Sequence, residues 1–536
     1  MKLLRILIPA ACILAVAGCS GKKGNPGAEL SPRLRTFNSQ GLPGPENSEW
    51  AQTILDRRIV VKDGIIQPWL NYDSMLVYSM NFLKRCELLD TPDGPKPAYL
   101  VTSKFNEDGT YPEGRNRNNQ GGNAYFGMKL FRYYYPYFGD IDALRPVRDL
   151  LDRMADFLTP DDWAWPGMVR TQDNDNPDGI YLDERIETDK AAMAAIAYFD
   201  YAEFTGEQKF KALAEHISEL LLKVTGTGNA QESPLPFRIN MRTGENQEVY
   251  SSDMIFVVKL YDRLLGMDTS LDKADIKAKR DFVLKWIKDY PMRNSLWSGY
   301  FEDVELALNN VNQFAPMETA RYFLNNPSAN PELEQDVLDL LAFVKGRFGG
   351  TVRFGGTSIC EQDVCFIEMS SHTARYASVL ARWAALTGNQ AAKDEALATF
   401  ALAEYSAYNK YSKGDVAINS TGLGYPKCWF SDSYFDYLPH YFEGMAAWPE
   451  MIPEGSDHIF STTCMLKDVA YGPGSVKYSA LEPDGTERIK LSFTPKVLSG
   501  GKELPKSMWS FGKWRDCEGI LTINRKGIKD IEIIKK

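Results

Sequence analysis

The sequence predicts a mainly α-helical ring of six hairpins followed by a small antiparallel β domain. Three observations predict this fold class. Glycines recur in similar helix-to-helix turns, helical hydrophobic patterns flank these turns, and after residue 455 the apolar residues alternate with a period of two.

The glycine turns set the repeat. Gly139, Gly206, Gly266 and Gly388 follow one another at intervals of 67, 60 and 122 residues, so one turn is missing near Asn326. The residue after the last helical turn often adopts a left-handed conformation, which Gly and Asn tolerate best. We therefore expect Asn326 to take the role that glycine has elsewhere. A repeat of this length suits two helices and one long loop.

The segments before these turns have helical periodicity. Tyr376, Val379, Leu380 and Trp383 follow the i, i+3, i+4 pattern of an amphipathic helix. Residues 191–197 are small and apolar on every side, which is typical of a helix that is buried all round. We expect such helices to form the inner layer of the ring.

Both ends of the helical region contribute to closing the ring. Residues 71–104 predict a first hairpin that turns at residues 91–94. The helix predicted at 436–450 is expected to pair with that at 50–58, which closes the ring and raises the number of hairpins to seven if it counts separately.

Long segments join the hairpins, and they indicate where the functional face lies. They span residues 159–188, 225–252, 290–317, 345–371 and 410–431. Short turns lie on one side of a ring of hairpins, so these segments must share the other side. Loops of such length in a compact domain are usually functional. The long-loop face is therefore the expected site.

The C-terminal region has a different pattern. Residues 476–480 and 488–493 alternate around a Pro-Asp-Gly turn, and residues 520–524 and 531–534 continue the alternation. We expect a helical ring at 48–455 and an antiparallel β domain at 456–536.

The N-terminus predicts export. Lys2 and Arg5 precede an apolar run that is too short for an ordinary membrane span. Val16-Ala17-Gly18-Cys19 resembles a bacterial lipobox, which implies a signal peptide at 1–18, lipidation of Cys19 and anchoring in the outer membrane. An ordinary cleaved signal with an incidental Cys19 is the alternative. Residues 19–47 are rich in Gly, Pro, Ser and Asn and predict a flexible tether.

Composition restricts the partners. The net charge of −10 disfavours a nucleic acid. Cys360 and Cys365 are close enough in sequence to form a disulfide in an exported protein, while the other cysteines of the mature chain suit buried thiols. No CxxC pair and no HExxH motif supports a zinc site.

Together, the lipobox, the helical hairpins with Thr-Gly turns and the C-terminal β domain resemble the (α/α)-toroid carbohydrate-active enzymes. This superfamily includes glycoside hydrolases, unsaturated glucuronyl hydrolases, polysaccharide lyases and sugar epimerases. The resemblance covers about residues 48–536 and implies an (α/α)6 toroid, or (α/α)7 with the extra hairpin. It is architectural, so it transfers no catalytic residue.

Polar residues at the starts of the first helix of each hairpin are candidates for the floor of a cavity. They are Asn123, Asp189, Asp253, Glu318, His372 and Asp432. Each could instead be a helix-terminal residue that caps the backbone and suits the helix dipole.

Asp189, Asp253, Glu318 and His372 are the predicted catalytic residues. Glycoside hydrolysis uses one protonated and one ionised carboxyl group, which two of the acids could supply from neighbouring hairpins. A β-elimination would need a base such as His372 or a tyrosine, together with groups that neutralise a uronate. The residues alone leave both reactions open.

Other loop residues are candidates for substrate binding. Arg170, Arg185 and Arg238 lie in or beside the long loops, where arginine could bind a carboxylate or sulfate in a bidentate way. Trp165 and Trp297 could stack on sugar rings, and Asn123 could hydrogen-bond to the sugar. The alternatives are ion pairs that hold the loops together and small hydrophobic cores within the loops.

A cation site is a further candidate. Residues 173–184 resemble a calcium loop, with Asp173, Asp175 and Glu184 as ligands, although Pro177 occupies one ligand position. The alternative is a plain Asx-rich turn. No cofactor is required.

These observations predict a glycan-degrading enzyme, a glycoside hydrolase acting on an acidic, uronic-acid-containing polysaccharide or oligosaccharide. A polysaccharide lyase and a non-catalytic glycan-binding lipoprotein are the alternatives.

Overall fold

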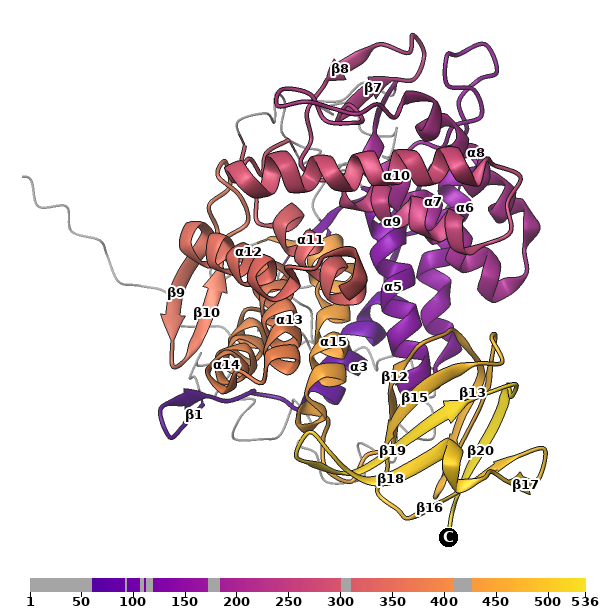
Figure 1. The fold of residues 1–536 in the computed structure, drawn as a ribbon, viewed down its shortest axis with the longest axis vertical. Coiled ribbons are helices and arrows are strands. Elements are labelled where there is room, and N and C mark those ends of the chain that lie inside the picture. Colours follow the sequence, from indigo (N-terminus) through magenta and orange to yellow (C-terminus); the bar gives the residue numbers. More distant parts are fainter. Residues whose placement is uncertain are drawn as a thin grey trace, which may run out of the picture. The chain divides into compact units, whose positions relative to one another are not determined.

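A computed structural model describes residues 60–91, 94–106, 110–111, 119–171, 184–299, 310–407 and 427–536. The described part is rich in helix, and its C-terminal region consists of strands (Figure 1).

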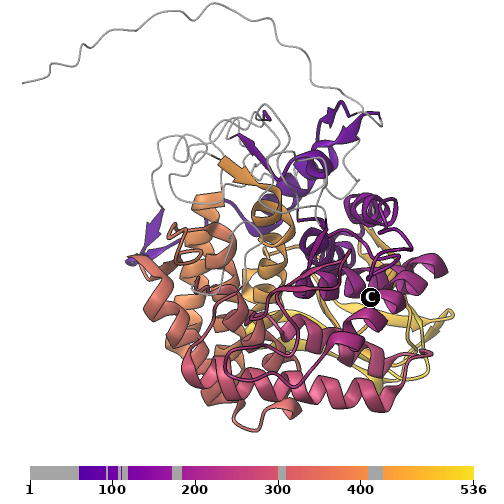
Figure 2. The same cartoon turned by 90° about the horizontal axis from the view of Figure 1, so that it is seen from above.

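Six helices form a closed inner layer. Each one contacts the next in chain order, and the last contacts the first. They are α5 (Gln120–Phe138), α7 (Thr188–Thr205), α9 (Ile255–Gly266), α11 (Phe314–Asn325), α13 (Ser370–Thr387) and α15 (Leu438–Ala447). Figure 2 shows α15 between the salmon helices α13 and α14 and the purple helices that follow residue 119. The predicted (α/α)6 toroid is confirmed.

Five outer helices each pack on the inner helix that precedes them in the chain. They are α6 (Arg145–Ala155), α8 (Gln208–Val224), α10 (Lys273–Ile287), α12 (Leu333–Phe348) and α14 (Gln390–Ala407). The inner helix α7 is buried along almost its whole length, as its run of alanines predicts. The outer helix α8 buries residues along one side only, including Phe210, Ala214 and Ile217.

The sixth outer position is taken by a helix from the start of the described chain, α3 (Tyr72–Lys84). The Tyr72 ring lies 5.1 Å from that of Tyr441 in α15, and the helix also contacts α6. Just before α3, the backbone N–H of Trp69 donates to Glu404 of α14 at 3.1 Å. The ring therefore closes between α3 and α15. The helix predicted at 50–58 lies outside the described residues.

The predicted first hairpin is wrong in its second half. After α3 the chain forms two short paired strands, β3 (Leu88–Leu89) and β4 (Lys96–Pro97), and then the single turn α4 (Ala98–Val101). Pro95 and Pro97 lack backbone N–H groups and exclude a regular helix there.

Three of the five predicted helix-ending turns have the expected geometry. Gly139, Gly206 and Gly388 are left-handed, with φ angles of 72°, 83° and 74°. Gly266 is instead the last residue of α9 and is not left-handed, and Asn326 ends α11 with φ −128°. At these two turns φ stays negative. Their sequence similarity to the other turns therefore did not predict their backbone conformation.

Small β-sheets lie beside the helices of the ring. One has the order β6 (Arg185–Glu187), β7 (Arg238–Asn240), β8 (Asn246–Glu248), and three more are two-stranded pairs in addition to β3–β4. The pairs are β1 (Val61–Lys62) with β2 (Ile65–Ile66), β5 (Lys104–Asn106) with β11 (Lys427–Trp429), and β9 (Gly349–Arg353) with β10 (Gly356–Ile359).

The C-terminal region forms two antiparallel sheets, as the alternation of apolar residues predicts. The four-stranded sheet has the order β12 (His458–Thr462), β15 (Gly485–Lys490), β19 (Cys517–Arg525), β18 (Trp509–Trp514). The five-stranded sheet has the order β13 (Leu466–Gly472), β14 (Ser475–Ala480), β20 (Asp530–Lys535), β16 (Pro495–Ser499), β17 (Lys502–Glu503).

This β domain packs against the C-terminal ends of the inner helices, next to α5 and α15 (Figure 1). His458 is buried there between two acceptors, with Nε2 2.7 Å from Asp73 and Nδ1 2.8 Å from the carbonyl oxygen of Tyr137. Both acceptors need a proton on the ring, so this histidine is held as an imidazolium. The β domain therefore lies on the short-turn face of the ring.

Among the described helices, none combines the length and apolar character that crossing a membrane requires.

Candidate active site

The predicted catalytic residues lie at the starts of consecutive inner helices. Asp189 and His372 are in the first turns of α7 and α13, Glu318 is in the second turn of α11, and Asp253 lies two residues before the start of α9. None of the four caps its helix through its side chain. All four are buried, with exposed fractions of at most 2%. The simple capping interpretation therefore does not account for them.

Asp189 and Asp253 form a pair of interacting carboxyl groups. Asp189 accepts from the ammonium of its neighbour Lys190 at 2.8 Å and from the Lys190 backbone N–H at 2.8 Å. Neither carboxylate oxygen of Asp253 has a hydrogen-bond partner, although the side chain is fully buried. Such an orphaned acid is rare in a folded core, and it calls for an explanation.

A proton on Asp253 explains the pair. Burial and the charge of Asp189 raise the pKa of Asp253 well above the usual carboxyl range, and Lys190 only partly opposes them. Two ionised carboxylates repel each other in a buried site, whereas a protonated Asp253 is neutral beside Asp189. The site thus holds a neutral Asp253 beside Asp189, which is paired with the Lys190 ammonium.

Glu318 has a different environment. It contacts Lys259 and Arg321 at 3.0 Å each and Arg375 at 3.4 Å. Burial alone would raise its pKa, but Arg321, Lys259 and other cations overcome that effect and hold the pKa well below its usual range. Glu318 therefore stays ionised and cannot serve as a proton donor.

His372 is neutral and a poor base. Its Nδ1 accepts from the guanidinium of Arg375 at 2.8 Å, which leaves the ring proton on Nε2. Burial and the charge of Arg375 lower its pKa to about 3. Arg375 also pairs with Asp436, and His440 lies 3.3 Å from the same carboxylate. Burial likewise lowers the pKa of His440 well below its usual range.

The four predicted residues are thus linked through the cations between them. Lys259 joins the surroundings of Asp253 to Glu318, and Arg375 joins Glu318 to His372. Asn123 is buried in the first turn of α5. The expectation that separate helix starts meet inside one ring agrees with these contacts.

The predicted substrate-binding residues of the loops are largely occupied within the protein. Arg238 is buried and pairs with Glu187 and Glu248 across the β6–β7–β8 sheet. Trp165 and Trp297 have exposed fractions of 5% and 1%, so protein covers their rings. In these three residues, loop packing takes up the groups that would bind sugar, and their contact with substrate stays a prediction.

Arg170 and Arg185 are the other two arginines that the sequence predicts to bind substrate. The Arg170 guanidinium lies 5.0 Å from the ring centre of Trp163, and Arg185 begins strand β6 with a half-buried side chain.

The remaining predicted sites are the calcium loop and the disulfide between Cys360 and Cys365. Asp173 and Asp175 lie outside the described residues, and Glu184 pairs with Arg242 at 3.0 Å and with Asn240 at 3.2 Å. Within the described ranges, no group of three or more His, Cys, Asp and Glu is arranged to hold a metal. Cys360 and Cys365 form no disulfide with each other. Cys19 is outside the described residues as well.

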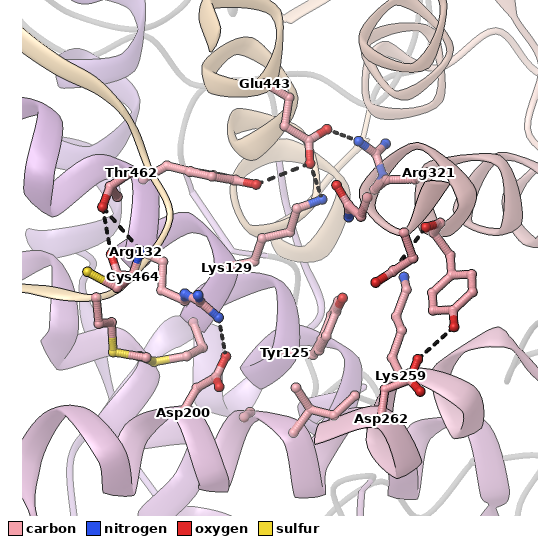
Figure 3. Close-up of a pocket in the computed structure, with 18 residues that line it drawn as sticks. Tyr125, Lys129, Arg132, Asp200, Lys259, Asp262, Arg321, Glu443, Thr462 and Cys464 are labelled. Carbon is pink, nitrogen blue, oxygen red and sulfur yellow. Dashed lines mark hydrogen bonds and ion pairs between the residues drawn. The ribbon is translucent and has the colours of Figure 1, made fainter. Parts of the chain in front are cut away.

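Sequence reasoning missed a cavity in the ring that faces the β domain (Figure 3). Its volume is about 350 Å³, and its walls come from α5, α7, α9, α11, α15 and the segment after β12. Lys129 contacts Glu443 at 2.9 Å, Arg321 pairs with the same carboxylate, and Arg132 contacts Asp200 at 2.9 Å (Figure 3). The signal in the sequence is a charged residue inside an apolar run, as Lys259 is in Phe256-Val257-Val258-Lys259-Leu260.

Comparison with solved structures shows the fold. A cellobiose 2-epimerase from Spirochaeta thermophila is similar over 80% of this chain and 100% of its own, with 11% identity and a TM-score of 0.51. A sugar epimerase from a ruminal bacterium and a cellobiose 2-epimerase from Bacillus thermoamylovorans each cover 69% of this chain and 97% of their own, with 10% identity and TM-scores of 0.50.

No protein-family model and no curated protein matches the sequence. The similarity to the solved structures shows that the chain shares the (α/α)6-toroid architecture of carbohydrate-active enzymes, as the sequence predicts.

Proposed function

We propose that this protein is a glycan-processing enzyme that hydrolyses glycosidic bonds, with Asp253 as proton donor and Asp189 as its ionised partner. The observation that carries the proposal is the buried carboxyl pair at the starts of α7 and α9. Glycoside hydrolysis needs one carboxylic acid to protonate the leaving oxygen and one carboxylate to act as base or nucleophile. Environments that push two acids apart in pKa assign these roles.

In this mechanism Asp253 gives its proton to the glycosidic oxygen as the bond to the sugar breaks. Asp189 stays ionised because Lys190 holds its second oxygen, and it activates water or attacks the sugar carbon. Two carboxyl groups suffice for this reaction, so the proposal includes no cofactor, and it includes no role for the candidate calcium loop.

The three solved structures compared above are named as epimerases, and epimerisation removes a proton from a carbon next to a carbonyl group. That step needs a base with a pKa near the working pH. The pKa values of His372 and His440 are both lowered, which makes them weak bases. The lowered pKa of His372 also disfavours a lyase that uses His372 as its base. Hydrolysis remains the reaction that the carboxyl pair supports best.

A non-catalytic glycan-binding protein is the alternative from another class. A binding site gains nothing from a fully buried carboxyl group without a hydrogen-bond partner, since that group destabilises the fold. Asp253 therefore favours an enzyme.

The proposed substrate is an acidic glycan. The cations inside the ring support an acidic substrate better than the loop arginines do. Lys129, Lys259 and Arg321 line the cavity of Figure 3. Residues 1–19 support export and a lipid anchor at Cys19 in the outer membrane, which stays a proposal from sequence.

The test compares the purified protein with its Asp253→Asn and Asp189→Asn variants on uronic-acid-containing, sulfated and neutral polysaccharides. We expect new reducing ends with the wild type, and turnover lowered about 10²- to 10⁴-fold in each variant. Asp161→Asn, at an exposed aspartate, is the matched control.

Each alternative has its own readout. Ultraviolet absorbance of an unsaturated uronide would show elimination, and a product of unchanged mass with a new sugar configuration would show epimerisation. Full turnover in both aspartate variants would reject the assigned residues.

A further inference from the structure

A second cavity lies between the ring and the β domain, at the end of the ring opposite to Asp189 and Asp253. Its volume is about 390 Å³. The C-terminal parts of α11, α13 and α15 form one wall, and β12, β15 and the end of β18 form the other. Tyr133, Asn325, Glu443 and Thr462 line both this cavity and that of Figure 3, so the two adjoin.

Three half-buried arginines line this second cavity, which we call the arginine cavity after Arg382, Arg488 and Arg515. Arg382 comes from α13, Arg488 from β15 and Arg515 from the turn that follows β18. They are far apart in sequence, and only the packing of the β domain on the ring brings them together.

Neutral groups hold the arginines in place. The Trp514 ring lies between two of them, 4.8 Å from the Arg488 guanidinium and 4.9 Å from that of Arg515. Arg515 also donates to the carbonyl oxygen of Ala385 at 2.9 Å, and Arg382 donates to Asn325 at 2.6 Å. Stacking and single hydrogen bonds leave most of the N–H donors of a guanidinium available.

The positive charge of the arginine cavity is not balanced locally. No described carboxylate forms an ion pair with Arg382, Arg488 or Arg515, and the Nε atoms of the latter two are buried without a hydrogen-bond partner. Glu443, the acidic residue that lines the cavity, is already paired with Arg321 and Lys129. Burial lowers the pKa of Arg382 to about 10, with a further contribution from Arg321. Desolvated cations without a counter-charge bind anions favourably.

The turn that carries Arg515 adds to this picture. Arg515 and Asp516 have φ angles of 48° and 63°, a left-handed pair for which Asn-Gly is the usual choice. This strained backbone conformation places the Arg515 guanidinium at the cavity.

We infer that the arginine cavity binds the carboxylate or sulfate of an acidic sugar, as a carbohydrate site separate from the carboxyl pair. Arginine forks recognise these planar or tetrahedral oxyanions through parallel hydrogen bonds. The exposed part of Tyr133 in the wall suits a sugar ring. The anion site rests on the arginines alone, whereas its sugar specificity rests on the proposed glycan function.

The test uses calorimetric titration of the full chain with four probes, none of which contains a glycosidic bond. They are sodium glucuronate, glucose 6-sulfate, glucose and sodium sulfate. We expect saturable binding of glucuronate, of glucose 6-sulfate or of both, with affinity lowered about tenfold or more in Arg382→Gln and in Arg515→Asn. Asn is chosen at 515 because it tolerates the left-handed conformation. Arg293→Gln, whose side chain is 73% exposed, is the matched control and should bind as the wild type does.

Thermal unfolding gives a second readout. A ligand of the folded state raises the Tm, so the acidic sugar should raise it in the wild type and in Arg293→Gln but not in the cavity variants. The two variants lie on opposite walls of the cavity, so a folding defect in one leaves the other as a test.

Equal affinity in wild type and cavity variants would overturn the inference, as would no binding of either acidic sugar. Binding of sulfate ion as tight as that of both sugars would overturn the carbohydrate part. Failure of the proposed function is separate: a wild type that binds glucuronate through Arg382 but cleaves no glycan would reject the hydrolase and keep this site. The Asp253→Asn variant should lose turnover and retain glucuronate binding.

Discussion

The two ends of the ring carry opposite chemistry. Where the inner helices start, Asp253 lies beside Asp189 in a fully buried site with its pKa raised, while at the other end Arg382, Arg488 and Arg515 surround a cavity without a paired carboxylate. The comparison teaches that one ring can hold an acid suited to proton transfer and, separately, an anion-binding surface.

A buried network separates the two ends. Arg321 is its centre, since it contacts Glu318 at 3.0 Å, pairs with Glu443 and lies 3.2 Å from Nδ1 of His440. Glu318 in this network is held ionised by the surrounding cations, in contrast to Asp253. The predictions below test whether the ends depend on it.

The largest effect is expected from Arg321→Ala. The change leaves two buried carboxylates without their main partner, and breaking a buried ion pair in this way costs about 3–5 kcal/mol of unfolding free energy. Urea unfolding measures the loss, and Arg293→Ala at an exposed site is the control. A loss below that of the control would show that Lys129 and Lys259 already balance the network.

The next effect concerns the contact of His458 in the β domain with Asp73 in α3. His458→Ala leaves the buried Asp73 carboxylate without its charged donor, so we expect a loss of roughly 2–3 kcal/mol. A double-mutant cycle with Asp73→Asn isolates the coupling between the two side chains. The same variants should weaken glucuronate binding if β-domain docking forms the cavity; unchanged binding would place the anion site elsewhere.

At the acidic end, Asp253→Asn should stabilise the protein at neutral pH by roughly 2 kcal/mol, because it removes a carboxyl group that is costly to ionise. The folded pKa of Asp253 lies above its unfolded value, so the folded wild type binds the extra proton and loses stability as pH rises between those values. Asparagine does not titrate.

The advantage of this variant should therefore grow from acid to neutral pH and vanish below the ordinary pKa of aspartate. Urea unfolding over a pH series measures it. An advantage that does not change with pH would mean that the pKa of Asp253 is the same in the folded and unfolded states.

The smallest effects are expected in the short turns. Gly388→Ala meets no neighbouring atom within 4 Å, so only the left-handed backbone opposes it, at a cost of about 1 kcal/mol. Gly139→Ala should cost more, because its added carbon would meet Tyr471 at 3.1 Å and the carbonyl oxygen of Val469 at 3.3 Å. Equal losses in thermal unfolding would show that the β domain yields at this contact.

Several features of the fold were predictable from local patterns. The left-handed Gly139, Gly206 and Gly388, the buried alanine helix α7 and the alternating strands after residue 455 each depend on neighbours in sequence. The second half of the first hairpin was not, since the prolines near residue 95 favour strands and a single turn there. Gly266 and Asn326 show that the same residue type can end a helix in different ways.

The candidate site divides along the same line. By itself, the sequence determined that acids lie at the helix starts and that a ring brings these starts together, because repeat spacing and helical period are local properties. Only the tertiary structure decided which charges meet: Asp253 beside Asp189, Arg238 between Glu187 and Glu248, and three arginines around one cavity. The physical reason is that burial and pairing set the protonation of each group, and both arise from residues that lie far apart in the chain.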